Sequence, residues 1–341
     1  MWLTRRARWR GVLGLGMSAA LLSTTGTGPA APNTAPPGDQ HRVAAGPYAS
    51  LIFSRTEITA ADDCVIDNRG IARLDSVVAP YLAARDMAAT GTLTTDATRP
   101  ARLGCTHERA SMTASWAHAT TLAQEFAWHF VSHTATYPRD LAGLTPERAA
   151  AETCGSAETL EAHGLPGARG LIAYPGAQAQ PVALQTDYGS RCFVWGRGFS
   201  AGGTGITKAE AATTAPYWQH TLTTNGGPCN AAAPACSNPT GARRYLLPAS
   251  IIALVNSLEP AEWLTLQSFV LVRGRSPAYS TSQVRWDCTA TDPRFHWTND
   301  WERYCYRDWQ AVVRSIDARA AVTVTDPLTV GIALGRAVPG E

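Results

Sequence analysis

The sequence is poor in charged residues and almost free of lysine. Only 16% of its 341 residues are charged, and Lys208 is the one lysine. It has no basic stripe of the kind that binds phosphate backbones, so no nucleic-acid partner is expected. Beyond the N-terminal region, no apolar stretch is long enough for a membrane helix. The 45% hydrophobic content instead predicts one large globular domain or two ordinary ones.

The first 31 residues have the layout of a secretory signal peptide. Four arginines precede the apolar run GVLGLGMSAALL, which at about 12 residues is too short to span a bilayer. We expect cleavage near Ala30 or Ala31; retention as a membrane anchor is the alternative. Residues 32–47 are rich in Pro, Ala and Gly and predict a disordered linker. The protein is therefore expected to be secreted, that is extracellular, without stable membrane insertion.

The cysteine content is consistent with a secreted protein. All eight follow the signal, and an even number in an exported chain predicts four disulfides. We expect neighbours in the sequence to pair, with Cys229–Cys236 and Cys288–Cys305 each closing a loop. A zinc site is the weaker alternative, because no C-x-x-C pair or Cys/His cluster has the usual spacing. No G-x-S-x-G elbow is present either, which disfavours a serine hydrolase.

From residue 48 onward, strand patterns alternate with helical ones. Strands are expected within 48–53, 89–95, 128–133, 170–175, 191–198 and 262–272, and helices within 71–86, 111–126, 145–164, 247–258 and 300–319. This alternation predicts an α/β fold with parallel strands and right-handed crossovers, in a (β/α)-type barrel over 48–318. Residues at about 200–245 form a loop insertion stapled by Cys229–Cys236, and 319–341 form a C-terminal tail. In such barrels sites lie at the carboxyl ends of strands, where His133 falls.

Several segments carry a resemblance to a known family. They are LIF at 51–53, VVAPYLAARDMAATGTL at 77–93, VSHTATYPRDLAGLTPERAAAE at 131–152, GLIAYPGAQ at 170–178 and EWLTLQSFVLV at 262–272. Their order and content resemble the polysaccharide deacetylase family, also known as the NodB-homology domain, and the 131–147 block is the most specific part. The resemblance implies a distorted (β/α)7 barrel, a divalent metal, often zinc, held by one Asp and two His, and hydrolysis of N- or O-acetyl groups on glycans.

The family's functional residues are mostly replaced. Its Phe-Asp-Asp motif corresponds to Phe53-Ser54-Arg55, so both carboxylates are missing there. His133 matches the first metal histidine, whereas Tyr137 stands in place of the second. The late catalytic histidine would fall among Gln267, Ser268 and Phe269, and the family's arginine near Leu171 or Ile172. One imidazole cannot hold a catalytic zinc, which needs three protein ligands, so the metal site is incomplete.

Asp62 and Asp63 could rebuild the site, because they follow the first strand at the barrel face where His133 is expected. With His133 they would form a ligand set or an acid–base pair. The alternatives are a solvated loop or a helix start for the aspartates and a structural role for His133. Ligand contact is also expected from Tyr137, Tyr174, Tyr217, Trp218 and Trp297, although large rings are also common in cores.

The sequence thus supports two hypotheses. The first is a secreted deacetylase-like hydrolase with a remodelled site, acting on an acetylated polysaccharide or cell-wall glycan. The second is a catalytically inactive homologue that binds a glycan or a cell-wall partner through the same cleft.

Overall fold

The computed structural model describes residues 46–54, 73–96, 116–138, 140–175, 185–198, 206–208, 219–220, 222–224, 247–268, 270–273, 288 and 303–336. All of them belong to the unit Arg42–Glu341. Of the residues expected in the site, Asp62, Asp63, Tyr217, Trp218 and Trp297 lie outside these ranges, as does the expected Cys229–Cys236 pair.

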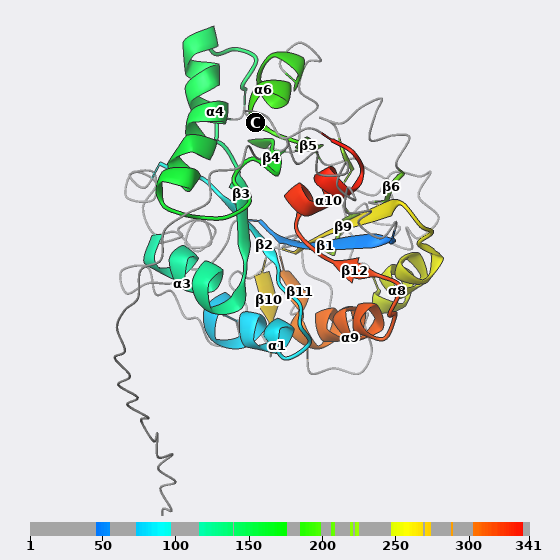
Figure 1. Ribbon diagram of the computed structural model, residues 1–341. Helices are drawn as coiled ribbons and strands as arrows, with labels where there is room; N and C mark the ends of the chain where they lie inside the picture. The colour runs from blue at the N-terminus through cyan, green and yellow to red at the C-terminus, as the bar shows by residue number, and fades with distance from the viewer. Residues whose placement is uncertain are drawn as a thin grey trace, which may run out of the picture. The chain divides into compact units, whose positions relative to one another are not determined.

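A curled sheet of mostly parallel strands runs through this unit (Figure 1). Its strands are β1 (Tyr48–Phe53), β2 (Thr90–Leu93), β3 (His129–Ser132), β4 (Leu171–Ala173), β5 (Trp195–Gly198), β6 (Ile206–Lys208), β7 (Gln219–His220), β8 (Leu222–Thr223), β9 (Glu262–Ser268) and β12 (Thr323–Val324). The order is β6-β9-β1-β2-β3-β4-β5-β7, with β8 on β9 and β12 on β1; β6 is antiparallel to β9. The expected α/β class with parallel strands is confirmed, and the curled sheet fits a distorted barrel.

The two shortest strands of the insertion connect distant parts of this order. β7 pairs with β5, and β8 pairs with β9, although only residue 221 separates β7 from β8. One short segment therefore contacts strands from both ends of the series. A complete seven-stranded barrel stays a prediction.

The helices begin and end largely where the sequence signals place them. They are η2 (Leu74–Val78), α1 (Ala79–Ala83), α3 (Trp116–Phe126), α4 (Pro146–Ala162), η5 (Gln185–Gly189), α6 (Ser190–Cys192), α8 (Pro248–Ser257), α9 (Tyr306–Asp317) and α10 (Pro327–Ala333). At the start of α4, Thr145 Oγ1 accepts a hydrogen bond from the Arg148 backbone N–H, and Pro146 is the first helical residue. Gly164 follows its end with φ +68°, a left-handed conformation that glycine adopts without strain. None of the helices in these ranges has the length and hydropathy of a membrane span.

Three segments differ from the expectation. The closing helix starts at Tyr306, because Arg303–Cys305 form β11, which pairs with β10 (Val270–Val272) in a second small sheet. The expected strand at 262–272 is thereby divided between two sheets. The insertion at 200–245, expected to be a loop, contains β6, β7 and β8. The Val/Thr-rich tail, for which a further strand was one of two expectations, contributes β12 and also α10. Strands of two or three residues are too short to show a hydrophobic period in the sequence. Their formation depends on pairing with neighbouring strands, which the sequence pattern does not show.

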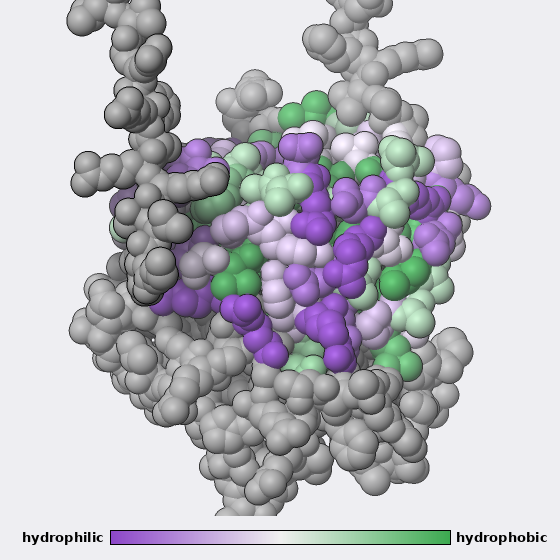
Figure 2. Space-filling model, turned by 90° about the horizontal axis from the view of Figure 1, so that it is seen from below, coloured by the Kyte–Doolittle hydropathy of each residue, from purple (hydrophilic) through white to green (hydrophobic). Residues whose placement is uncertain are grey.

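The surface shows no large apolar area over the described residues on the face seen in Figure 2. Hydrophilic and hydrophobic residues are interspersed there. Among the described residues, the exposed large hydrophobic side chains are Leu247 and Ile332. Single apolar residues of this kind are normal on protein surfaces and do not indicate a binding face.

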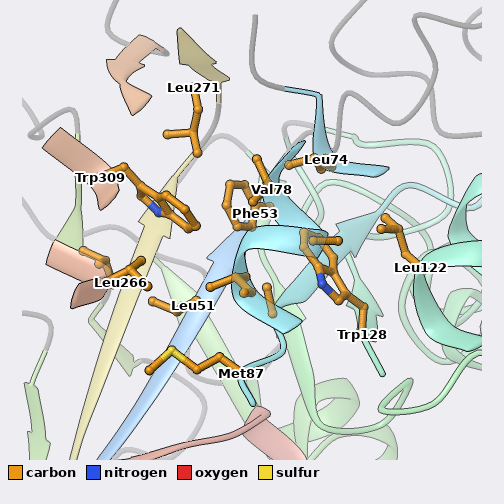
Figure 3. Close-up of a cluster of buried hydrophobic side chains, with 14 of the residues drawn as sticks. Leu51, Phe53, Leu74, Val78, Met87, Leu122, Trp128, Leu266, Leu271 and Trp309 are labelled. Atoms are coloured by element: carbon orange, nitrogen blue, oxygen red, sulfur yellow. The ribbon is translucent and has the colours of Figure 1, made fainter. Parts of the chain in front are cut away.

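The outer face of the sheet is covered by helices over a large hydrophobic core (Figure 3). Phe53 at the end of β1 lies between two indoles: its ring centroid is 5.4 Å from that of Trp128 and 5.9 Å from that of Trp309. Leu51 and Leu266 belong to the same core, together with residues from α1, α3, α8 and α9. Successive side chains in a strand face opposite sides, so this packing leaves the alternate residues of β1 and β9 facing inward.

The inner face has a separate apolar cluster. It contains Tyr48, Ile52, Val131, Leu171, Val194, Trp195, Trp263 and Val330. Val330 belongs to α10, and Trp195 Nε1 donates a hydrogen bond of 2.9 Å to the Pro327 carbonyl. Gly331 allows this close approach, since a Cβ there would overlap a methyl of Val194. Helix α10 therefore packs against this apolar cluster.

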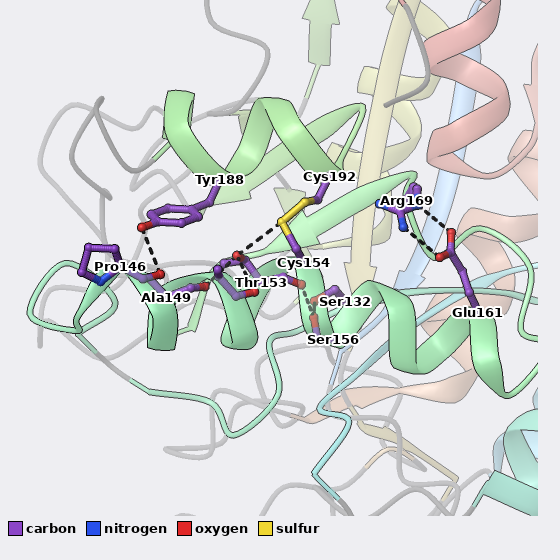
Figure 4. The surroundings of a disulfide bond; sticks show 11 residues. Ser132, Pro146, Ala149, Thr153, Cys154, Ser156, Glu161, Arg169, Tyr188 and Cys192 are labelled. Carbon is purple, nitrogen blue, oxygen red and sulfur yellow. Dashed lines mark hydrogen bonds and ion pairs between the residues drawn. A yellow bond between two sulfur atoms is a disulfide. The ribbon is translucent and has the colours of Figure 1, made fainter. Parts of the chain in front are cut away.

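Two disulfides are present among the described residues. The expected Cys288–Cys305 pair is confirmed, and Cys154–Cys192 joins α4 to α6. Figure 4 shows the second bond, with Tyr188 Oη donating to the Pro146 carbonyl nearby. Both bonds join cysteines that are successive in the sequence, as the pairing of neighbours predicted.

Candidate functional site

Polar residues replace apolar ones on the inner face toward the carboxyl ends of the strands. Ser54 follows β1, His133 follows β3, and the others lie in β2, β5 and β9. We call Ser54, Thr92, His133, Arg197 and Gln267 the polar layer; none is more than 5% exposed. Ser54, His133, Arg197 and Gln267 lie two or four residues along the chain from the inward-facing Ile52, Val131, Trp195 and Trp263, respectively. Thr92 reaches the same place through its hydrogen bond to Ser54. The period of two in a strand thus brings residues far apart in the sequence to one place.

Arg197 is at the centre of the hydrogen bonding in this layer. Its Nη1 donates to Gln267 Oε1 at 2.5 Å and its Nη2 to Ser54 Oγ at 3.0 Å. Thr92 Oγ1 donates to the same Ser54 oxygen at 3.2 Å. These bonds connect strands β1, β2, β5 and β9.

The environment of Arg197 disfavours its charge. Burial lowers the pKa of the guanidinium to about 9, and the interaction with Tyr137 opposes this effect. Removing a cation from water is costly unless other groups compensate for the lost hydration.

His133 is held in one orientation by the neighbouring strand. Its Nδ1 lies 2.7 Å from the Ala173 carbonyl oxygen. A carbonyl only accepts hydrogen bonds, so in the neutral ring Nδ1 carries the proton and Nε2 carries the lone pair. This is the tautomer that a base or a metal ligand coordinating through Nε2 requires.

The loop after His133 is strained and clamped. Thr134 has φ +65° and Tyr137 has φ +60°, a region that side chains other than Gly, Asn and Asp rarely adopt. Glu152 of α4 holds the loop between them, since its carboxylate accepts from the backbone N–H of Thr136 at 2.7 Å and from the Thr136 hydroxyl at 2.5 Å. The Tyr137 ring then packs edge-on against His133, with centroids 4.8 Å apart. Strain of this kind is concentrated at functional sites in proteins.

The described residues of the layer do not fit a catalytic zinc ion. They offer one imidazole, two hydroxyls and an amide, and the buried guanidinium of Arg197 would repel a divalent cation. Within the ranges that the structure describes, no group of three or more His, Cys, Asp and Glu side chains is placed to hold a metal. No step through a metal is therefore derived from these residues.

Three of the predicted site residues, His133, Tyr137 and Tyr174, lie within the described ranges, and their surroundings differ from one another. The ring of His133, a member of the polar layer, contacts the ring of Tyr137. Tyr174 is 2% exposed and packs with Ile172 and Phe193 in a hydrophobic cluster. This surrounding is that of a core residue, and the ligand contact expected of it stays a prediction.

Arg197 is the residue that the sequence analysis missed. The resemblance singled out Ser54 and Gln267 only as replacements for the family's carboxylate and histidine. In the structure, both side chains accept hydrogen bonds from Arg197. The missed signal was a charged residue inside an apolar strand pattern, two residues after Trp195 and hence on the same face.

Comparisons with known proteins do not identify a family for this chain. No family model and no curated protein matches the chain. Among solved structures, the chain is similar to a peptidoglycan N-acetylglucosamine deacetylase crystallised with a benzamide compound, at a TM-score of 0.33 and 11% identity, over 66% of this chain and 77% of that one. A likeness at this level decides neither fold nor activity. What the residues define is an α/β protein with a curled parallel sheet and a buried polar layer at the carboxyl ends of its strands.

Proposed function

We propose that the protein is a secreted, polysaccharide deacetylase-like protein that binds an acetylated glycan at the polar layer. The observation that carries this proposal is the composition of the layer: hydroxyl, amide, imidazole and guanidinium groups meet at the carboxyl ends of parallel strands. Such groups suit the hydroxyl and acetamido groups of sugars, and ligands of α/β sheets bind at this edge. The resemblance of residues 131–152 to the deacetylase family supports the choice of ligand. The disulfides Cys154–Cys192 and Cys288–Cys305 are compatible with an extracellular location.

Binding is favoured over metal-dependent hydrolysis by the same residues. Ser54 and Gln267 stand where the family carries a carboxylate and a histidine. Neither side chain can act as a general base at neutral pH, and Arg197 opposes a metal ion.

Hydrolysis of the acetyl group is the second candidate, because one observation favours it. The hydrogen bond from His133 Nδ1 to the Ala173 carbonyl sets the tautomer in which Nε2 is the basic nitrogen of the ring. A hydrolase of this kind would need a further carboxylate, for which Asp62 and Asp63 are the candidates.

Binding can be measured with the full secreted chain and an insoluble acetylated glycan, with a chemically deacetylated sample as reference. His133→Gln and Tyr137→Phe are expected to weaken binding at least about fivefold, since each loses one polar contact worth about 1 kcal/mol. His163→Gln and Tyr188→Phe are the matched controls, because both residues lie on or next to α4 and η5, outside the polar layer. Equal binding to both glycan samples, or equal losses in the controls, would contradict the proposal.

Acetate release distinguishes the two candidates. The wild-type chain is assayed on the acetylated glycan with and without added zinc. Release that His133→Gln abolishes and His163→Gln does not would establish the hydrolase. Retention of the glycan without release supports binding alone.

A further inference from the structure

Glu152 of α4 bonds to two successive residues of the loop after His133. Its carboxylate accepts from the N–H and the hydroxyl of Thr136, and its backbone carbonyl accepts from the Ala135 N–H at 3.0 Å. Glu152 is only 5% exposed, whereas Thr136 is exposed. Hydrogen bonds to a carboxylate are stronger than those to a neutral acceptor, so this residue fixes the backbone of the loop firmly.

Helix α4 also holds the beginning of the same loop. The Tyr137 N–H donates to Thr134 Oγ1 at 3.0 Å, and the Thr134 N–H donates to Ser132 Oγ at 3.0 Å. Ser132 Oγ is hydrogen-bonded to Ser156 Oγ, one helical turn after Glu152 on α4. A backbone with positive φ at Thr134 and Tyr137 persists only where its surroundings determine it, and α4 provides these surroundings.

The Tyr137 side chain is the part of this loop that contacts the polar layer. Its ring lies edge-on against the His133 ring, with centroids 4.8 Å apart. Burial lowers the pKa of Arg197, and the interaction with Tyr137 opposes this effect, so Tyr137 is within electrostatic reach of Arg197 as well. Tyr137 is half-buried, whereas His133 is 5% and Arg197 2% exposed. Of these three residues, Tyr137 is therefore the most accessible to a ligand from solvent.

From these contacts we propose that Glu152 is a positioning residue for glycan binding, which fixes the Tyr137 ring in the orientation that the ligand requires. Glu152 acts through the loop and does not itself contact the ligand. A loop that is already fixed in its bound conformation loses less conformational entropy on binding, which increases the affinity. The inference rests on the proposed function and adds to it the residue that orders the site.

A double-mutant cycle of Glu152→Gln and Tyr137→Ala tests whether the two residues act as one unit. It is measured with the full secreted chain and the insoluble acetylated glycan. We expect Glu152→Gln alone to weaken binding at least about fivefold. In the Tyr137→Ala background the same change should weaken binding less than about twofold, because no ring is left to position. Equal losses in the two backgrounds would overturn the inference.

Glu161→Gln is the matched control on the same helix. The exposed Glu161 accepts from Arg169 Nε at 2.6 Å and from Arg169 Nη2 at 2.9 Å, away from the loop after His133. This variant should change binding less than about twofold in either background, and a loss as large as that of Glu152→Gln would contradict the positioning role. Thermal unfolding sets a temperature at which every variant is folded. If Glu152→Gln does not fold, Glu152→Asp takes its place with the same expectation, because it keeps the carboxylate but shortens the side chain.

The NMR resonances of the His133 ring provide a measurement that does not depend on the glycan. The ring current of Tyr137 shifts these resonances, and Tyr137→Ala shows the size and direction of the shift. Glu152→Gln should move the His133 resonances in the same direction, whereas Glu161→Gln should leave them in place. If the wild-type chain binds no glycan, the proposed function fails, and the resonances still decide whether Glu152 positions Tyr137. Unmoved His133 resonances in Glu152→Gln overturn the inference even where glycan binding stands.

Discussion

Removing the Cys154–Cys192 disulfide should destabilise the protein more than removing Cys288–Cys305. The first bond closes a loop of 38 residues and the second a loop of 17. If a disulfide acts by restricting the unfolded chain, these lengths correspond to about 4 and about 3 kcal/mol of the free energy of unfolding. The first bond also joins α4, which carries the Glu152 clamp, to α6. Its loss should therefore loosen the loop that holds His133 as well.

The comparison uses two double variants, Cys154→Ala with Cys192→Ala and Cys288→Ala with Cys305→Ala. Each removes two sulfur atoms, and each pair contains at least one buried cysteine, so the packing losses are of similar kind. Denaturant unfolding at neutral pH gives the free energy of unfolding of each double variant. The midpoint denaturant concentrations are compared only if the slope of the free energy against denaturant concentration is unchanged. A loss for the long loop equal to or smaller than that for the short loop would refute the chain-entropy reasoning.

Three further predictions concern the elements around the polar layer. Glu152→Gln should cost about 1–3 kcal/mol and speed hydrogen exchange at Thr136, because the amide N–H₂ replaces one of the two carboxylate oxygens and cannot accept from the Thr136 donor that bonded there; unchanged exchange would contradict the clamp. Thr145→Ala should cost about 1 kcal/mol in denaturant unfolding through loss of the α4 cap, and no loss would mean that the cap is immaterial. Burial raises the pKa of Asp326, but the hydrogen bond and charge of His129 lower it further, so the net pKa lies below the ordinary value. The stability from this carboxylate is present above about pH 4 and is lost as the pH falls below it. Asp326→Asn keeps the cap of α10 and should flatten this acid limb of the Tm profile; an unchanged limb would refute the assignment.

The polar layer also explains why the family resemblance was only partly informative. The positions that the resemblance singled out, Ser54, His133 and Gln267, do lie on the inner side of the sheet. His133 matches the family's histidine, whereas Ser54 and Gln267 replace its carboxylate and its late histidine, and the resemblance did not indicate Arg197, the centre of the layer. Comparing motifs along the chain identifies where the strands end, because the motifs occur in the same order as the strands. It cannot show which distant side chain contacts a replaced residue.

The sequence by itself determined the alternation of strands and helices, the parallel connections and the start of α4. These features depend on local signals: apolar periods, the Thr145-Pro146 cap, and Gly164 at the end of the helix. It also predicted the Cys288–Cys305 bond through the pairing of neighbours. The tertiary structure alone decided the short strands β7, β8, β11 and β12, the packing of α10 against the inner face, and the meeting of Arg197 with Gln267. The reason is physical: strands of two or three residues and buried polar pairs are stabilised by partners distant in sequence, and no local pattern encodes such a partner.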